Sequence, residues 1–238
     1  MKNASATRPS VSAGPRRRPE SGGYARGDEV RSRILLAAIA LFGEQGFASA
    51  STRAIAACAG VNPPALQYYF HNKERLHQAC GQYIADNIKT NLREPMLRAA
   101  EVLKAADRSA AADALWAIVE TVVDHSSNET EIPGWTQFLA QVVAEASDTS
   151  LGLIHEAVEP LFKMLTALLA LAWNRAPDDE AARLSAVLLL GQARVFGIHR
   201  QGTLTMMDWP DFGDGRLDAA KRCLRSLTLS MVATPLSA

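Results

Sequence analysis

Cysteines, aromatic residues and long apolar runs are all scarce in this 238-residue sequence. The three cysteines, Cys58, Cys80 and Cys223, are widely spaced and odd in number, so they suggest neither a disulfide framework nor a zinc site. No apolar run reaches the roughly 18 to 20 residues that a membrane-spanning helix needs, and the N-terminus lacks the apolar segment of a signal peptide. We therefore expect a cytoplasmic protein with no membrane partner.

Alanine and leucine, by contrast, are abundant. Hydrophobic residues make up 48% of the chain and aromatic residues only 6%, a composition that favours helices over sheets. Apolar residues recur at helical spacing along the chain after residue 27, which predicts an all-α fold. The predicted helices span about 28–46, 52–59, 63–71, 73–93, 96–106, 111–126, 134–147, 151–174, 178–199 and 214–232. Pro95 is expected to end the fourth helix, and residues 201–215 are expected to form a break between helices.

The charges sum to zero but are unevenly distributed. Residues 1–27 contain six basic residues and one acidic residue, whereas residues 79–238 contain 14 basic and 20 acidic residues. A polyanion would therefore meet the first third of the chain. Residues 1–27 are also rich in Pro, Ser, Gly and Arg, so we predict a disordered basic tail. Its arginines either contact DNA or belong to a leader without function.

Two adjacent prolines lie in the stretch GVNPPALQYYFHNK, residues 60–73. Asn62 is a suitable N-cap, and Pro63 and Pro64 then fall in the first helical turn, where backbone N–H groups have no intrahelical acceptor. The prolines therefore begin a helix. Together with the short helix before it and the turn at Gly60, this helix forms a predicted helix-turn-helix, whose second helix enters the major groove of DNA.

The residues of this unit suggest distinct roles at a DNA surface. Pro63, Pro64 and Ala65 offer an apolar edge to a thymine methyl group, and Gln67 suits an adenine. The phenol and ammonium groups at the far end of the helix would hold phosphates. Leu66 and Phe70 are expected in the core. The predicted DNA-binding set is Thr52, Arg53, Asn62, Pro63, Pro64, Ala65, Gln67, Tyr68, Tyr69 and Lys73.

The stretch TRAIAACAGVNPPALQYYFHNKERL resembles the DNA-binding signature of the TetR family of bacterial transcriptional regulators. Within the family, YYFHNKERLHQACGQYIADNI and LLGQARVFGIHR most resemble the CecR (YbiH-like) subgroup. The resemblance implies an all-helical homodimer that binds a double-stranded operator, with a DNA-binding domain over 28–88 and a ligand-binding and dimerisation domain over 89–238. It implies a ligand-responsive repressor, with an activator as the alternative. Family members often differ at Gln67 and at Pro63-Pro64, so the base preference is not carried over.

Other classes of protein find little support in the sequence. A bundle enzyme with two metals needs paired Glu-x-x-His motifs, and Glu74 to His77 is the single instance. No phosphate-binding loop or nucleophile elbow appears. We therefore expect no enzyme, no metal and no cofactor. An adaptor that binds only proteins remains a further alternative, which duplex binding would exclude.

Aromatic and polar residues in the second half predict a small-molecule site. Such sites are apolar cavities with a few polar groups, and Gln141 and Glu145 lie four apart on one helix face. Each of these residues could equally be ordinary core or surface. The predicted ligand-binding set is Trp116, His125, Phe138, Gln141, Glu145, His155 and Phe162.

Apolar stripes on the last two long helices predict a two-fold interface. Packed with their symmetry mates, the two helices would make a four-helix bundle. Gln192, Arg194 and His199 either add polar specificity there or are exposed to solvent. The predicted dimer-interface set is Leu184, Leu188, Gly191, Val195, Leu224 and Leu227.

Overall fold

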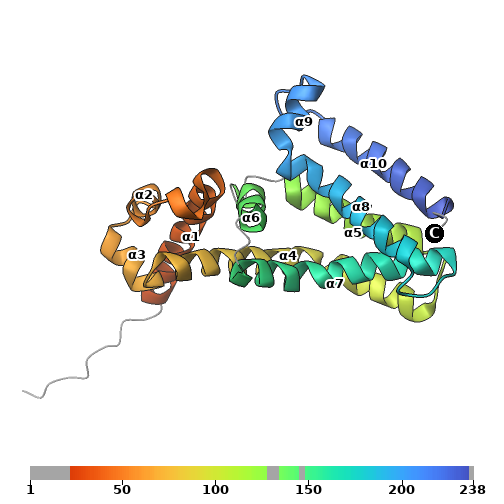
Figure 1. Ribbon diagram of the computed structural model, residues 1–238, viewed down its shortest axis with the longest axis horizontal. Helices are drawn as coiled ribbons and strands as arrows, with labels where there is room; N and C mark the ends of the chain where they lie inside the picture. The colour runs from red at the N-terminus through yellow and green to blue at the C-terminus, as the bar shows by residue number, and fades with distance from the viewer. Residues whose placement is uncertain (1–21, 128–133, 145–147, 236–238) are drawn as a thin grey trace, which may run out of the picture.

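The computed structural model describes residues 22–127, 134–144 and 148–235, and within these ranges every regular element is a helix. A small head of three helices lies at one end of the molecule, and a larger helical body lies at the other (Figure 1). The helices are α1 (Gly22–Ser49), α2 (Thr52–Cys58), α3 (Pro63–Phe70), α4 (Lys73–Ala105), α5 (Ala111–Ser127), α6 (Trp135–Ala144), α7 (Asp148–Trp173), α8 (Glu180–Ile198), α9 (Arg200–Met207) and α10 (Arg216–Ala233).

The first helix is longer than the sequence predicts at both of its ends. It begins at Gly22, so the prediction that the tail extends to residue 27 is wrong for its last six residues, while residues 1–21 lie outside the described part of the chain. The expected stop at Gly46 appears as a kink, with φ 75° and ψ 165°, after which one short helical segment continues to Ser49.

The fourth helix corrects a second prediction, because Pro95 lies inside it rather than at its end. Proline removes one intrahelical hydrogen bond and usually breaks a helix. Here Leu92, Pro95 and Ala99 are all buried, so packing on both sides of the proline offsets the lost bond. The helix therefore runs through residue 88, the predicted domain boundary, and joins the head to the body (Figure 1).

The predicted break over 201–215 contains another helix, α9. Gly and Thr in this segment are poor helix formers, which is why the sequence pattern missed it. Leu204 is buried, and beyond the helix Phe212 packs edge-on against Phe196 at 5.9 Å between ring centroids. Tertiary packing thus overrides local propensity.

The head is connected to the body by α6 as well as by α4. Along α6, Gly134 approaches α1 so closely that a Cβ atom placed on Gly43 would lie 2.7 Å from the Gly134 carbonyl oxygen. Phe138 is fully buried, and its ring lies 4.9 Å from the ring of His77 and 6.4 Å from that of Phe42. An aromatic cluster therefore fills the junction between the two parts.

Candidate DNA-binding surface and effector cavity

The predicted helix-turn-helix forms with the capping interactions that its sequence suggests. Ser51 caps α2 by accepting a hydrogen bond from the Ala54 N–H at 3.1 Å, and Asn62 caps α3 by accepting one from the Ala65 N–H at 2.9 Å. Pro63 begins α3 at the position where a missing N–H costs least. Gly60, in the turn between the two helices, has φ 65°, which a residue with a Cβ rarely adopts.

Burial divides α3 into a core face and an exposed face. Leu66 and Phe70 are buried against the head, as predicted. Pro63, Pro64 and Gln67 are exposed, and Tyr68 is 77% exposed. The rest of the predicted DNA-binding set is also accessible, with Arg53 and Asn62 exposed and Thr52, Ala65, Tyr69 and Lys73 partly buried. The exposed face of α3 thus presents an apolar leading edge followed by an amide and phenols.

Lys73 has an additional structural role that the sequence did not indicate. Its Nζ donates a hydrogen bond to the carbonyl of Ala48 at 3.2 Å and lies 4.6 Å from the centroid of the Phe47 ring. These contacts fix the start of α4 against the end of α1. An ammonium group has three donors, so the contact with Ala48 leaves capacity for a phosphate oxygen.

Two arginines of α1 flank the same surface and were missed by the sequence analysis. The Arg31 guanidinium lies 5.4 Å from the centroid of the Phe70 ring, and Arg33 lies beside Gly60 in the turn. Both are exposed. The sequence pattern indicates that both arginines face away from the buried Ile34 and Leu35. It does not indicate that they lie next to α3.

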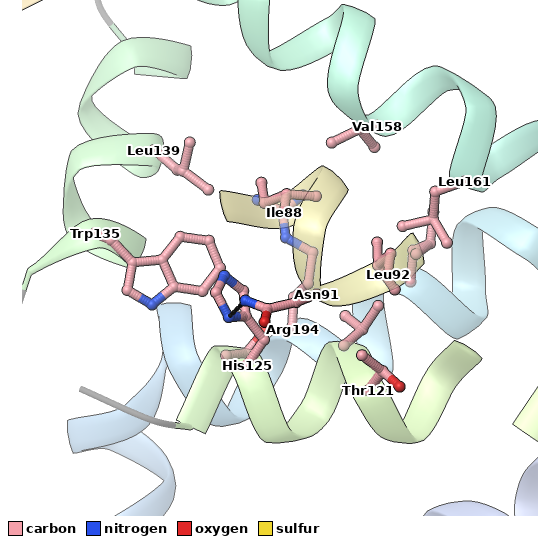
Figure 2. Close-up of a pocket in the computed structure, with 13 residues that line it drawn as sticks. Ile88, Asn91, Leu92, Thr121, His125, Trp135, Leu139, Val158, Leu161 and Arg194 are labelled. Atoms are coloured by element: carbon pink, nitrogen blue, oxygen red, sulfur yellow. Dashed lines mark hydrogen bonds between the residues drawn. The ribbon is translucent and has the colours of Figure 1, made fainter. Parts of the chain in front are cut away.

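A cavity of about 50 Å³ lies inside the body, between α4, α5, α6, α7 and α8 (Figure 2). Its walls are mainly apolar, with Ile88, Leu92, Trp135, Leu139, Leu161 and Leu190 among the lining residues. This volume holds only a few water molecules, so a larger ligand has to widen the cavity by moving the helices around it.

The polar groups of the cavity gather on one side. In Figure 2, Trp135, His125 and Asn91 lie together, with Arg194 next to them, while Val158 and Leu161 lie across the cavity. The Nδ2 atom of Asn91 is 3.0 Å from Nδ1 of His125 and 2.8 Å from Oδ1 of Asn87. The Asn91 amide and the His125 imidazole are therefore in direct contact at the cavity wall.

The structure brings few of the predicted ligand-binding residues to this cavity. His125 lines it, but Trp116, Phe138 and Phe162 do not. Trp116 lies on the opposite side of α5, near α10. Phe138 faces the head, and His155 is exposed. Gln141 is half-buried outside the cavity, and Glu145 lies outside the described residues. The spacing of apolar residues did not identify the side chains that line the cavity, because α6 and α7 are apolar on more than one face.

The predicted apolar stripe on α8 is present on the surface. Leu184, Val187 and Leu188 are 54%, 54% and 46% exposed, while the opposite face of α8 is buried in the body. Among the described helices, α8 is the one whose length and composition would also allow it to cross a membrane, a weak criterion that core helices satisfy as well. Its two apolar faces, one buried and one exposed, account for this composition.

An open groove of about 640 Å³ continues this surface between α8, α9 and α10. Gly191, Val195 and Leu227, which belong to the predicted interface set, line the groove. Leu224 also borders it but is only 4% exposed, so the expectation that Leu224 faces a partner is corrected: it packs inside its own chain. The prediction that Arg194 lies at the interface or in solvent is also corrected, because this residue lines the inner cavity. Gln192 and His199 are exposed.

The Glu-x-x-His motif has no metal-site geometry. His77 is buried among the rings of Phe42, Phe47 and Phe138, and Glu74 is exposed. Within the described ranges, no group of three His, Cys, Asp or Glu side chains could hold a metal ion. Of the two cysteines in this part of the chain, Cys80 is buried and Cys58 is exposed.

Comparisons with known proteins agree with this architecture. Residues 34–80 match the family described as bacterial regulatory proteins, tetR family, and residues 111–234 match the C-terminal domain of the HTH-type transcriptional dual regulator CecR. The chain is 32% identical to that dual regulator from Shigella flexneri over 199 residues, which cover 81% of this chain and 86% of the relative.

Several solved structures share the fold. A TetR-like regulator from Rhodococcus sp. RHA1 is 22% identical, with a TM-score of 0.56, over 86% of this chain and 96% of its own. FadR from Bacillus subtilis, solved with stearoyl-CoA, is 18% identical, with a TM-score of 0.55, over 84% and 97% of the two chains. AibR, solved with isovaleryl coenzyme A and operator DNA, is 18% identical, with a TM-score of 0.59, over 87% and 100%.

Proposed function

The chain belongs to the TetR family of bacterial transcriptional regulators, in the group of the dual regulator CecR, and we propose that it is a dimeric, effector-responsive repressor. As a family member it is a DNA-binding regulator and not an enzyme. In the proposal, two copies hold a palindromic operator in the bacterial cytoplasm, and a small molecule in the body cavity releases it. The AibR complex, with a coenzyme A thioester and operator DNA in one structure, supports this combination of ligands.

The exposed face of α3 supports the DNA-binding half of the proposal. Its leading turn carries Pro63 and Pro64, which are exposed and rigid, and Gln67 follows one turn later on the exposed side. A short helix with an accessible N-terminal half suits the major groove. Arg31, Arg33 and Arg53 surround it with positive charge for the phosphates.

The apolar surface of α8 and the adjoining groove support the dimer. Exposed leucines and valines that form a continuous patch usually mark a binding surface. We propose that a second copy covers this patch through a two-fold axis, so that Leu184, Leu188 and Leu227 meet their symmetry-related residues. Two heads can then read half-sites about 34 to 36 Å apart.

The position of α6 is the observation that carries the coupling between effector and DNA. Trp135 and Leu139 of α6 line the cavity, while Phe138 of the same helix and Gly134, just before it, pack against the head. The aromatic contacts continue from Phe138 through His77 to Phe47, over which Lys73 lies.

A ligand that widens the cavity would therefore displace α6 and, with it, the packing beneath the start of α4. The ligand can release DNA only by as much as it favours the displaced state. We propose α6 as the main connection and α4 as the element that moves with it. The same geometry serves an activator if the operator lies where binding assists the polymerase, and the dual regulator CecR is a relative with both roles in its name.

A selection from randomised duplexes with the full chain tests this function. We expect enrichment of a palindrome whose half-sites are one helical turn apart, bound by a dimer in gel shifts. Compounds that raise the melting temperature of the protein should then weaken operator binding. Enrichment of no sequence would overturn the DNA-binding half, and a compound that binds in the cavity without altering operator affinity would overturn the coupling.

A further inference from the structure

Arg194 places a positive charge in the wall of the cavity, without a negative partner among the residues that the structure describes. It extends from α8, is partly buried, and lines the cavity next to apolar residues such as Leu190. Among the described residues it makes no ion pair and no hydrogen bond, and burial lowers the pKa of its guanidinium from the ordinary value without any opposing charge. A guanidinium stays protonated in proteins, so a buried one without an anion is unfavourable.

The other polar side chains that the structure describes around the cavity supply no counter-ion for Arg194. Nδ2 of the Asn91 amide lies 3.0 Å from Nδ1 of His125, so these two groups contact each other. The Thr121 hydroxyl donates to the carbonyl of Ala117 at 2.8 Å. No aspartate or glutamate is among the described residues that line the cavity.

The acidic residues of α5 that are nearest in sequence to the cavity-lining residues already form ion pairs with α10. Glu120 and Asp124 contact the Lys221 ammonium of α10 at 3.0 and 2.9 Å. Burial alone would lower the pKa of Lys221, but its hydrogen bonds to Asp124 and Glu120 raise it, as expected for a well-satisfied ion pair. These carboxylates therefore compensate Lys221 and are not available to Arg194.

We propose that the effector is a small organic acid, whose single anionic group pairs with Arg194 and whose apolar body fills the remainder of the cavity. The inference rests on the proposed function, since it assigns the chemical class of ligand to the proposed effector site. A carboxylate matches a guanidinium in two parallel hydrogen bonds, and the mainly apolar walls suit a ring or a short acyl chain.

The test compares acids with their uncharged amides on the full-length protein. Benzoate and hexanoate are titrated beside benzamide and hexanamide, with affinity measured by calorimetry and stability by thermal unfolding. We expect the acids to bind and raise the melting temperature, and the amides to bind at least about tenfold more weakly. The variant Arg194→Met should lose this preference, while Arg93→Met, an exposed arginine on α4, should keep it.

The ligand-free protein provides a second measurement. Because Arg194→Met removes a partly buried charge that has no partner among the described residues, its melting temperature without ligand should equal or exceed that of the wild type. Arg194→Lys should bind the acids with intermediate affinity, since a lysine keeps the charge but not the bidentate geometry.

The outcomes separate this inference from the proposed function. Equal binding of acids and amides, binding of acids to Arg194→Met as to the wild type, or no binding of either acid overturns the inference. If the acids bind through Arg194 but leave affinity for the selected operator unchanged, the anion site stands and its role as the effector site is refuted.

Discussion

The DNA-binding surface and the effector cavity are constructed in opposite ways. The first comes from one continuous stretch of chain, residues 52–73, whose functional side chains project from short, separately capped helices. The second is enclosed by five helices that begin at residues 73, 111, 135, 148 and 180. The exposed residues of α3 can therefore change at little cost to the fold, whereas residues around the cavity and the α6 junction also hold the body together.

The largest effect is expected at the junction. Phe138→Ala should reduce the free energy of unfolding by about 3 to 5 kcal/mol, because it leaves a void beside the rings of Phe42 and His77. Chemical denaturation measures this loss. The control is Val143→Ala on the same helix, an exposed site whose change should stay within about 0.5 kcal/mol. A loss for Phe138→Ala no greater than for the control would show that α6 is not anchored to the head.

The dimer surface should give the next largest effect. Leu188→Glu places a charge in the proposed two-fold interface and should weaken dimerisation by about 3 kcal/mol, or roughly a hundredfold. Sedimentation of the protein over a range of concentrations measures the change. Leu97→Glu, at an equally exposed leucine of α4, should leave the dimer intact. A dimer that is equally stable in both variants would place the interface elsewhere.

On α3, we expect a change in specificity without a change in stability. Gln67→Ala should reduce discrimination at one base pair of the operator by about 1 to 3 kcal/mol, while the free energy of unfolding stays within about 0.5 kcal/mol of wild type because Gln67 is exposed. Binding to operators with each base varied in turn measures this. Gln201→Ala, in the body, is the control, and an unaltered base preference in Gln67→Ala would remove this residue from the readout.

Substitution of Lys73 should give the smallest effect, which is divided between DNA binding and stability. Lys73→Ala should weaken binding to all duplexes alike and reduce the slope of log affinity against log salt by about 1. It should also cost about 1 kcal/mol of stability, since it loses the Ala48 carbonyl and the Phe47 ring. Lys104→Ala, exposed near the other end of α4, should change neither property. An unchanged salt slope would restrict Lys73 to its structural role.

The sequence predicted the DNA-binding surface better than it predicted the effector cavity. The cap at Asn62, the proline start of α3 and the buried Leu66 and Phe70 were all predicted, because each depends on neighbours a few residues away. Phe138 was assigned to the ligand site although it packs on the head, and Arg194 was assigned to the exposed side of α8 although it lines the cavity. Both lie on helices that are apolar on two faces, so periodicity does not determine which face meets which neighbour.

Pro95 has a mechanical consequence for the long helix that joins the two regions. At about 1.5 Å per residue the 33 residues of α4 extend for roughly 50 Å. Pro95 has no N–H to offer the carbonyl of Asn91, so the rod has its lowest bending stiffness beside the cavity that Asn91 lines. The start of α4, next to α3, lies roughly 33 Å from that point, so a bend of about 5° there would move it by about 3 Å while both halves keep their own hydrogen bonds.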